Sequence, residues 1–158
     1  MESAAVETKE EKKGEIVYPE GFSVGYATID ISGSVFPMKY YGGEATGVQD
    51  PLLLTCVALC DGENVALIMS ADLKKMYGKV FNQSAKIIEK NFGIPVENVI
   101  ISSTHSHSAP DAGEENASGN MQWVQQYYKQ VPIVVEEALR DLDVVEGCID
   151  GYFSYPWR

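Results

Sequence analysis

The sequence predicts an α/β fold: a mixed sheet with a β-hairpin and parallel crossover strands, and helices packed on the sheet. Two apolar runs, residues 52–59 and 65–70, are joined by a short Asp-Gly turn, a pattern typical of a hairpin. A third apolar run, residues 99–101, follows a segment with helical periodicity. Because strand–helix–strand units form right-handed parallel crossovers, the third run is expected to lie parallel to its predecessor.

Composition limits both the class of protein and its partners. At 158 residues and 45% hydrophobic content, the chain can form one globular core. A net charge of −11 argues against nucleic acid as a partner and against electrostatic attraction to anionic membranes. No apolar stretch reaches the roughly 18 residues that a transmembrane helix needs. The three cysteines, Cys56, Cys60 and Cys148, form no disulfide framework and are expected to be free thiols.

The N-terminal part combines a charged leader with a first strand. Residues 1–16 are rich in Glu, Lys and Ala and are expected to be a disordered leader, which leaves residues 17–158 as the domain. Residues 22–32 are predicted to form a strand, in which Gly25 indicates the close approach of another backbone. The glycine-dense stretch 40–47 is predicted to be a loop.

The middle of the chain supplies the hairpin and the first helix. Both hairpin strands are nearly continuous in apolar residues, so both of their faces are expected to be covered. Apolar residues then repeat at spacings of three and four, which predicts a helix over residues 73–91. Gly93 is expected to end this helix, and Pro95 strengthens the stop.

The last part of the chain predicts a second helix and a final strand. The helix covers residues 123–142, with a kink or a fresh start expected at Pro132. Its aromatic side chains are expected in the core rather than on a substrate platform. Residues 111–120 are acidic and small, which suggests a rim, and residues 146–157 are predicted to form the last strand.

Candidate chemistry concentrates at the end of the third apolar run. This segment carries both histidines of the chain, His105 and His107, two positions apart. Side chains at i and i+2 of an extended segment point to the same side, so two imidazoles are expected to reach one cleft. Neutral imidazole is a common ligand of zinc and similar metals, and the nearby Asp111 could orient a ring or bind a cation. A hydrogen-bonded surface pair is the alternative.

Two other places carry candidate site residues. Asp72 falls just past the second hairpin strand, where ligands bind in such sheets, so it is a candidate catalytic carboxylate; it could equally cap the following helix. Gly42 and Gly43 could turn backbone N–H groups toward a substrate, although an ordinary connection is the alternative.

These residues lie within a family resemblance. Residues 103–111, Ser-Thr-His-Ser-His-Ser-Ala-Pro-Asp, resemble the Thr-His-Thr-His-Ser-(Gly/Ala)-Pro-Gly signature of the neutral/alkaline (non-lysosomal) ceramidases. Residues 24–33, 38–43 and 65–73 resemble further segments of that family, in the family's order. The resemblance runs from about residue 22 to about residue 152, and it covers only the N-terminal portion of the family's catalytic domain.

The resemblance implies a zinc-dependent amide hydrolase that converts ceramide to sphingosine and a fatty acid. It implies His105 as the metal ligand and His107 as a catalytic residue that stabilises the oxyanion or moves a proton. It also implies a lipid amide as substrate and a secreted or cell-surface location. The family's other ligands, a second His, a Glu and a Tyr, come much later in the chain. An incomplete site, inactive by itself, is therefore expected.

Departures from the family pattern leave alternatives open. Residues 47–51 replace an Arg-containing segment, and Asp111 and Ala112 stand where the family usually has Gly. Another metallo-amidohydrolase, acting on a different lipid or sugar amide, is one alternative. Metallo-β-lactamase-like enzymes also use His-x-His after a strand, but Ala109 and Pro110 stand where their motif continues with Asp-His. The last alternative is a non-catalytic domain that binds a lipid or a partner.

Overall fold

A computed structural model describes residues 14–34, 36–110, 112 and 120–145. The strands are β1 (Ser23–Asp30), β2 (Met38–Tyr40), β3 (Gly43–Ala45), β4 (Leu53–Cys60), β5 (Val65–Ala71), β6 (Val99–Ser103) and β7 (Asp143–Val144). The helices are α1 (Gly78–Phe92), the 3-10 turn η1 (Val96–Asn98) and α3 (Met121–Arg140).

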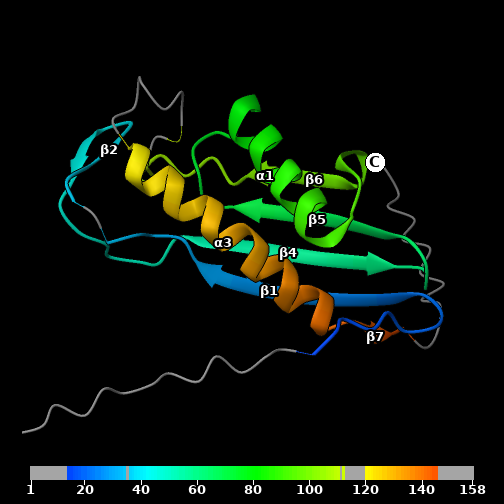
Figure 1. Ribbon diagram of the computed structural model, residues 1–158. Helices are drawn as coiled ribbons and strands as arrows, with labels where there is room; N and C mark the ends of the chain where they lie inside the picture. Colours follow the sequence, from blue (N-terminus) through cyan, green and yellow to red (C-terminus); the bar gives the residue numbers. More distant parts are fainter. Residues whose placement is uncertain (1–13, 35, 111, 113–119, 146–158) are drawn as a thin grey trace, which may run out of the picture.

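One mixed sheet and two helices form the described fold. The sheet has the strand order β6-β5-β4-β1-β7, and β2 and β3 pair separately as a small hairpin. Helices α1 and α3 lie together on one face of the sheet (Figure 1). Strands β4 and β5 are antiparallel, whereas β5 and β6 are parallel and joined through α1. The predicted α/β fold, with its hairpin and its parallel crossover, is confirmed.

The connections around α1 follow local chemistry. The β4–β5 turn is fixed by Asp61, whose carboxylate accepts hydrogen bonds from the backbone N–H groups of Glu63 and Asn64, at 3.0 Å and 2.7 Å. These bonds lower the pKa of Asp61 to about 2. Helix α1 begins at Gly78, later than predicted, and ends as predicted at Gly93, which adopts a φ of 69° and donates its N–H to Glu89 O.

Helix α3 is continuous where the sequence suggested an interruption. It runs as one helix across Pro132, so the predicted fresh start is wrong, whereas the alternative of a kink stays a prediction. Trp123 and Tyr127 are buried and stacked at a centroid distance of 5.6 Å, and Trp123 Nε1 donates a hydrogen bond to Ile31 O at 2.7 Å. The aromatic side chains therefore anchor the helix in the core, as predicted. Packing on both sides of the proline outweighs the single lost helical hydrogen bond.

Gly25 allows α3 to cross β1 at close range. A side chain at this position would overlap the carbonyl oxygen of Ala138 and would lie 2.9 Å from Leu142 N. The close approach of another backbone, predicted from the sequence, is confirmed. The C-terminal end of the helix thus rests directly on the backbone of β1.

Only one face of the sheet is covered by the described residues. Side chains facing the helices are buried, including Cys56 and Cys60, which are free thiols as predicted. On the opposite face, Tyr26 is 54% exposed, Ile68 47% and Ile100 60%. The expectation that both faces of the hairpin strands are covered is therefore wrong within the described part of the chain. A continuous apolar run did not distinguish a buried strand from one with a free apolar face.

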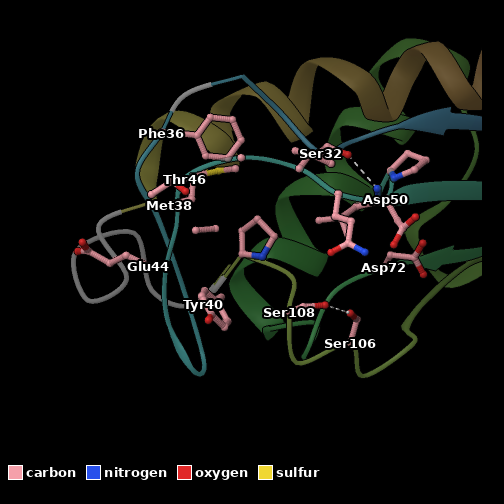
Figure 2. A pocket seen from close by; sticks show the side chains of 17 residues that line it. Ser32, Phe36, Met38, Tyr40, Glu44, Thr46, Asp50, Asp72, Ser106 and Ser108 are labelled. Carbon is pink, nitrogen blue, oxygen red and sulfur yellow. Dashed lines mark hydrogen bonds between the residues drawn. The ribbon is translucent and has the colours of Figure 1, made fainter.

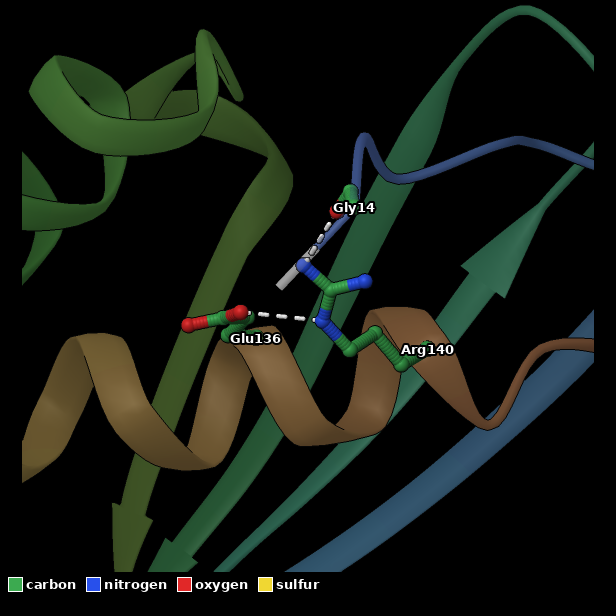
Figure 3. A network of polar contacts seen from close by, with 3 residues as sticks. All are labelled: Gly14, Glu136 and Arg140. Atoms are coloured by element: carbon green, nitrogen blue, oxygen red, sulfur yellow. Dashed lines mark hydrogen bonds and ion pairs between the residues drawn. The ribbon is translucent and has the colours of Figure 1, made fainter. Parts of the chain in front are cut away.

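The described ends of the chain lie beside α3 and β1. Gly14 O accepts a hydrogen bond from Arg140 Nη2 at 2.7 Å, and Arg140 Nε also pairs with Glu136 Oε1 at 2.9 Å (Figure 3). At the other end, Val145 N donates to Phe22 O at 3.0 Å. Residues 1–13 of the predicted leader, the predicted last strand at 146–157 with Cys148, and most of the predicted rim with Asp111 lie outside the described residues.

Candidate functional site at the carboxyl edge of the sheet

The loop that carries the histidines is fixed by backbone contacts where it leaves the end of β6. Thr104 N donates to Ala71 O at 3.0 Å, which extends the parallel ladder by one residue. Further along, Ala109 and Pro110 are buried, and Pro110 forms an isolated bridge with Tyr40. The His105–His107 segment is thus held at both ends, first by the sheet and then by the small hairpin.

Asp72 fastens three strand ends together. One carboxylate oxygen accepts a hydrogen bond from Leu53 N at 2.9 Å, and the other accepts one from Thr104 Oγ1 at 3.0 Å. The helix-cap alternative is wrong, because α1 begins at Gly78 with Tyr77 as its N-cap. Asp72 contacts the residue preceding His105, so the geometry makes it a residue that positions the loop; its catalytic role stays a prediction.

His105 is held in a specific orientation. Its backbone adopts a φ of 64°, a left-handed conformation that is uncommon for a residue other than glycine. Its Nδ1 lies 2.6 Å from the carbonyl oxygen of Lys74. Because a carbonyl can only accept, Nδ1 carries a proton and donates, which in the neutral imidazole leaves the lone pair on Nε2. Positive φ values of this kind cluster at ligand-binding and catalytic positions.

His107 turns its Nε2 toward the same point. The two Nε2 atoms are 3.1 Å apart, and the ring centroids are 4.7 Å apart with an interplanar angle of 79°. The two rings converge as expected from the sequence, but not through strand alternation, because β6 ends at Ser103 and His105 has a left-handed backbone. Two imidazole nitrogens bound to one tetrahedral zinc at about 2.05 Å would lie about 3.3 Å apart. The observed spacing fits either that arrangement or a direct hydrogen bond.

Tyr41 and Lys74 complete the surroundings of His107, and sequence reasoning missed both of them. Tyr41 contacts the His107 ring edge-on, at a centroid distance of 4.9 Å, and Lys74 Nζ lies 3.5 Å from the centroid of the Tyr41 ring. The two side chains come from different loops, so no spacing in the sequence links them. The Lys74 ammonium group therefore lies against the same Tyr41 ring that contacts His107.

Gly42 and Gly43 belong to a hairpin rather than to the predicted loop. Gly43 begins β3 and pairs with Tyr40 of β2, so Tyr41 and Gly42 form the turn. This correction places the glycines next to Tyr41, the residue that touches His107. Their role as backbone donors to a substrate stays a prediction.

A cavity of about 770 Å³ lies beside the histidine loop, between the small hairpin and residues 46–52. Ser106 and Ser108, which alternate with the histidines, face it and contact each other at 3.3 Å (Figure 2). Asp72 also lines the cavity, whereas neither imidazole does. The lining is mixed: apolar side chains such as Phe36, Met38, Leu52 and Pro110 stand beside polar ones such as Glu44 and Asp50. The loop therefore presents serine hydroxyl groups to the cavity, whereas its imidazoles lie outside the cavity lining.

The donor set fits a metal site only in part. Both imidazoles are exposed, and their Nε2 atoms converge. Within residues 14–34, 36–110, 112 and 120–145, no group of three or more His, Cys, Asp or Glu side chains could hold a metal ion. Catalytic zinc sites generally use three protein ligands plus a water molecule. The described residues therefore supply part of such a site.

These features define an α/β domain with paired imidazoles at the carboxyl edge of a mixed sheet. Among solved structures, this fold matches part of the neutral ceramidase from Pseudomonas aeruginosa, with a TM-score of 0.69 and 17% sequence identity. A ceramidase complexed with C2 matches with the same values. Each match covers 80% of this chain and 22% of the ceramidase chain. Neither a protein-family model nor a curated protein sequence gives a significant match.

The structural matches confirm the ceramidase resemblance at the level of the fold. The chain spans less than a quarter of the ceramidases that it matches, because 22% of each is covered. Among the described residues, no helix is both long enough and apolar enough to cross a membrane.

Proposed function

We propose that this chain is part of a zinc-dependent amide hydrolase of the neutral ceramidase type. His105 is the metal ligand in this proposal, and His107 acts beside it. The observation that carries the proposal is the 3.1 Å approach of the two Nε2 atoms, on a loop that leaves the sheet of a ceramidase-like fold. The alternative of a hydrogen-bonded surface pair does not account for the backbone conformation of His105.

The orientation of His105 supports metal binding. Metal-ligating histidines usually donate their second ring N–H to a carbonyl or carboxylate, which fixes the tautomer and directs the lone pair. The Lys74 carbonyl makes this contact with Nδ1 at 2.6 Å. His105 is therefore prepared to bind through Nε2.

In this proposal, the residues around His105 have separate roles in proton transfer and in positioning. A bound zinc ion lowers the pKa of a coordinated water molecule and polarises an amide carbonyl. His107 is close enough to His105 Nε2 to take or return a proton at the reacting centre. Asp72 holds Thr104 and so positions the loop, and Tyr41 covers one edge of the His107 ring. The missing ligands come from polypeptide outside the described residues.

The proposed substrate is a lipid amide such as ceramide. A cavity of mixed polar and apolar lining beside the histidine loop supports this choice, because its volume is within the usual range for small-molecule sites. One of the matched ceramidases is complexed with C2. Gly42 and Gly43, in the hairpin next to Tyr41, are proposed to offer backbone N–H groups to the polar end of the substrate.

Zinc titration of the full chain by calorimetry tests the proposal. We expect binding that is weak for a zinc protein, and no detectable binding in the His105→Ala variant. His107→Ala should weaken binding about 10- to 100-fold, as is typical for residues that support a metal ligand. Ser106→Ala is the matched control, because this side chain faces the cavity, and it should leave the affinity unchanged.

Unchanged zinc affinity in His105→Ala, or no zinc binding by the full chain, would overturn the metal assignment. A ceramide-hydrolysis assay tests separately whether the site needs ligands from other polypeptide. We expect no turnover by this chain alone, because its described residues supply at most two ligands. Turnover that a chelator and His105→Ala both abolish would mean instead that the chain carries a complete site.

A further inference from the structure

The face of the sheet opposite α1 and α3, here called the open face, is organised in rows. The register places Tyr26, Val57, Ile68 and Ile100 side by side across four strands. The next row toward the histidine loop contains only hydroxyl side chains: Thr28, Thr55, Ser70 and Ser102. On the other side of the apolar row lie Val24, Leu59 and Ala66. The half of the open face that is distant from the histidines is therefore apolar.

This apolar half is left partly exposed by the described residues. Tyr26, Ile68 and Ile100 expose about half or more of their side chains. Three large, exposed apolar side chains in one row of a sheet face indicate a surface that another polypeptide segment covers.

The described chain ends close to this surface. Strand β7 pairs with the start of β1, where Val144 lies opposite Ser23, and Val145 N donates to Phe22 O at 3.0 Å. Residues 146–158 therefore continue from the end of the sheet at which the two apolar rows lie. Thirteen residues can extend about 43 Å, whereas the three strand spacings from β1 to β6 add up to about 14 Å.

Residues 146–158 differ in composition from the other two longer segments outside the described residues, 1–13 and 113–119. Residues 1–13 are dominated by Glu and Lys, and residues 113–119 read Gly-Glu-Glu-Asn-Ala-Ser-Gly. Residues 146–158 contain Ile149, Tyr152, Phe153, Tyr155 and Trp157. Only the C-terminal segment of the three has the apolar side chains that a sheet face of this kind can bury.

We propose that residues 146–158 pack across the apolar half of the open face and cover the row from Tyr26 to Ile100. A tethered segment acts at an effective concentration in the millimolar range, about a thousandfold above a micromolar second copy of the chain. The chain's own segment is therefore favoured over a dimer through the same face. This inference is independent of the proposed hydrolase function.

Trp157 is a natural probe of this packing. The chain has two tryptophans, and Trp123, which belongs to α3, is buried in the core. The difference between the emission spectra of the full chain and of its Trp157→Phe variant isolates the emission of Trp157. We expect a blue-shifted emission that acrylamide quenches weakly.

Ile100→Glu should shift the Trp157 emission to the red and increase quenching, because it places a charge beneath the segment. Ile68→Glu on the adjacent strand should do the same. Ile133→Glu, at an exposed position of α3, is the matched control and should leave the emission unchanged. Circular dichroism verifies that each variant remains folded.

Free quenching of Trp157 in the unmodified chain would overturn the proposal without the need for any variant of the open face. Unchanged emission in folded Ile100→Glu and Ile68→Glu would also overturn it. Light scattering that detects a dimer, with Trp157 emission that changes on dilution, would identify a second copy of the chain as the occupant instead.

Discussion

The side-chain amide of Asn120 hydrogen-bonds both backbone groups of Lys39. Its Oδ1 accepts from Lys39 N at 2.9 Å, and its Nδ2 donates to Lys39 O at 2.6 Å. Asn120 precedes α3, is only 4% exposed, and here acts in place of a neighbouring strand. Lys39 lies in β2, two residues before Tyr41. This pairing therefore fixes the small hairpin that places Tyr41 against His107.

Asn120→Ala should lower the free energy of unfolding by about 1–3 kcal/mol, because it leaves both backbone groups of Lys39 without this partner. Urea denaturation followed by circular dichroism measures the change. Asn82→Ala is the matched control; Asn82 is exposed on α1, and its replacement should stay within about 0.5 kcal/mol. Equal effects of the two substitutions would contradict the bridging role.

Gly25→Ala should destabilise the protein by about 1–3 kcal/mol or more, because the added methyl group meets the backbone of α3 at Ala138. Thermal unfolding monitored by calorimetry gives the difference. Gly78→Ala is the control: a methyl group added there would have no neighbour within 4 Å, and alanine favours the helix that begins at this residue. A neutral Gly25→Ala would mean that α3 can move away from β1 without loss.

Asp72→Ala should weaken zinc binding without removing a metal ligand, because it releases Thr104 from the strand ends. It should also lower the free energy of unfolding by about 1.5–3 kcal/mol, the usual range for a hydrogen bond to a charged group. Calorimetric zinc titration and urea denaturation of the same variant provide both values. Asp50→Ala, which removes an exposed carboxylate of the same cavity, should change neither value.

Stability should fall as the pH rises from about 9 to 12. Burial raises the pKa of the Cys56 thiol from 9.0 to about 12 and the pKa of the Tyr127 hydroxyl from 10.0 to about 12. The unfolded chain loses these protons first, so the free energy of unfolding decreases with pH, by at most about 1.4 kcal/mol per pH unit for each group. Urea denaturation across this pH range measures the slope. Cys56→Ala should flatten the curve between pH 9 and 10; an unchanged slope there would contradict this origin.

Local sequence patterns predicted those elements whose signal lies within a few residues. The β4–β5 hairpin, the parallel partner β6 and the glycine end of α1 all follow from periodicity and turn chemistry. The convergence of the two imidazoles was expected from an extended segment, but β6 ends at Ser103 and His105 adopts a φ of 64°, so the loop conformation brings the rings together. The resemblance to ceramidases further limited the choice of fold.

What the sequence could not provide depends on long-range contacts. The hairpin of β2 and β3 has strands of three residues each, too short for an alternating pattern, and Asn120 holds it from far along the chain. The acceptor for His105 is the backbone carbonyl of Lys74, which no side-chain pattern can reveal. Tertiary packing carried α3 across Pro132 against its local preference.

The crossing of α3 over β1 also determines when the molecule can finish folding. Tyr26 N donates to a carboxylate oxygen of Asp141, 115 residues later in the sequence. At a translation rate of about 5–20 residues per second, the 115 residues between Tyr26 and Asp141 take roughly 6–23 seconds to synthesise, and β1 lacks this contact during that time. During that interval the apolar side chains of β1 and β4 that α3 later buries face solvent. Newly synthesised chains are therefore most exposed to aggregation and most in need of chaperones just before the ribosome completes the second helix.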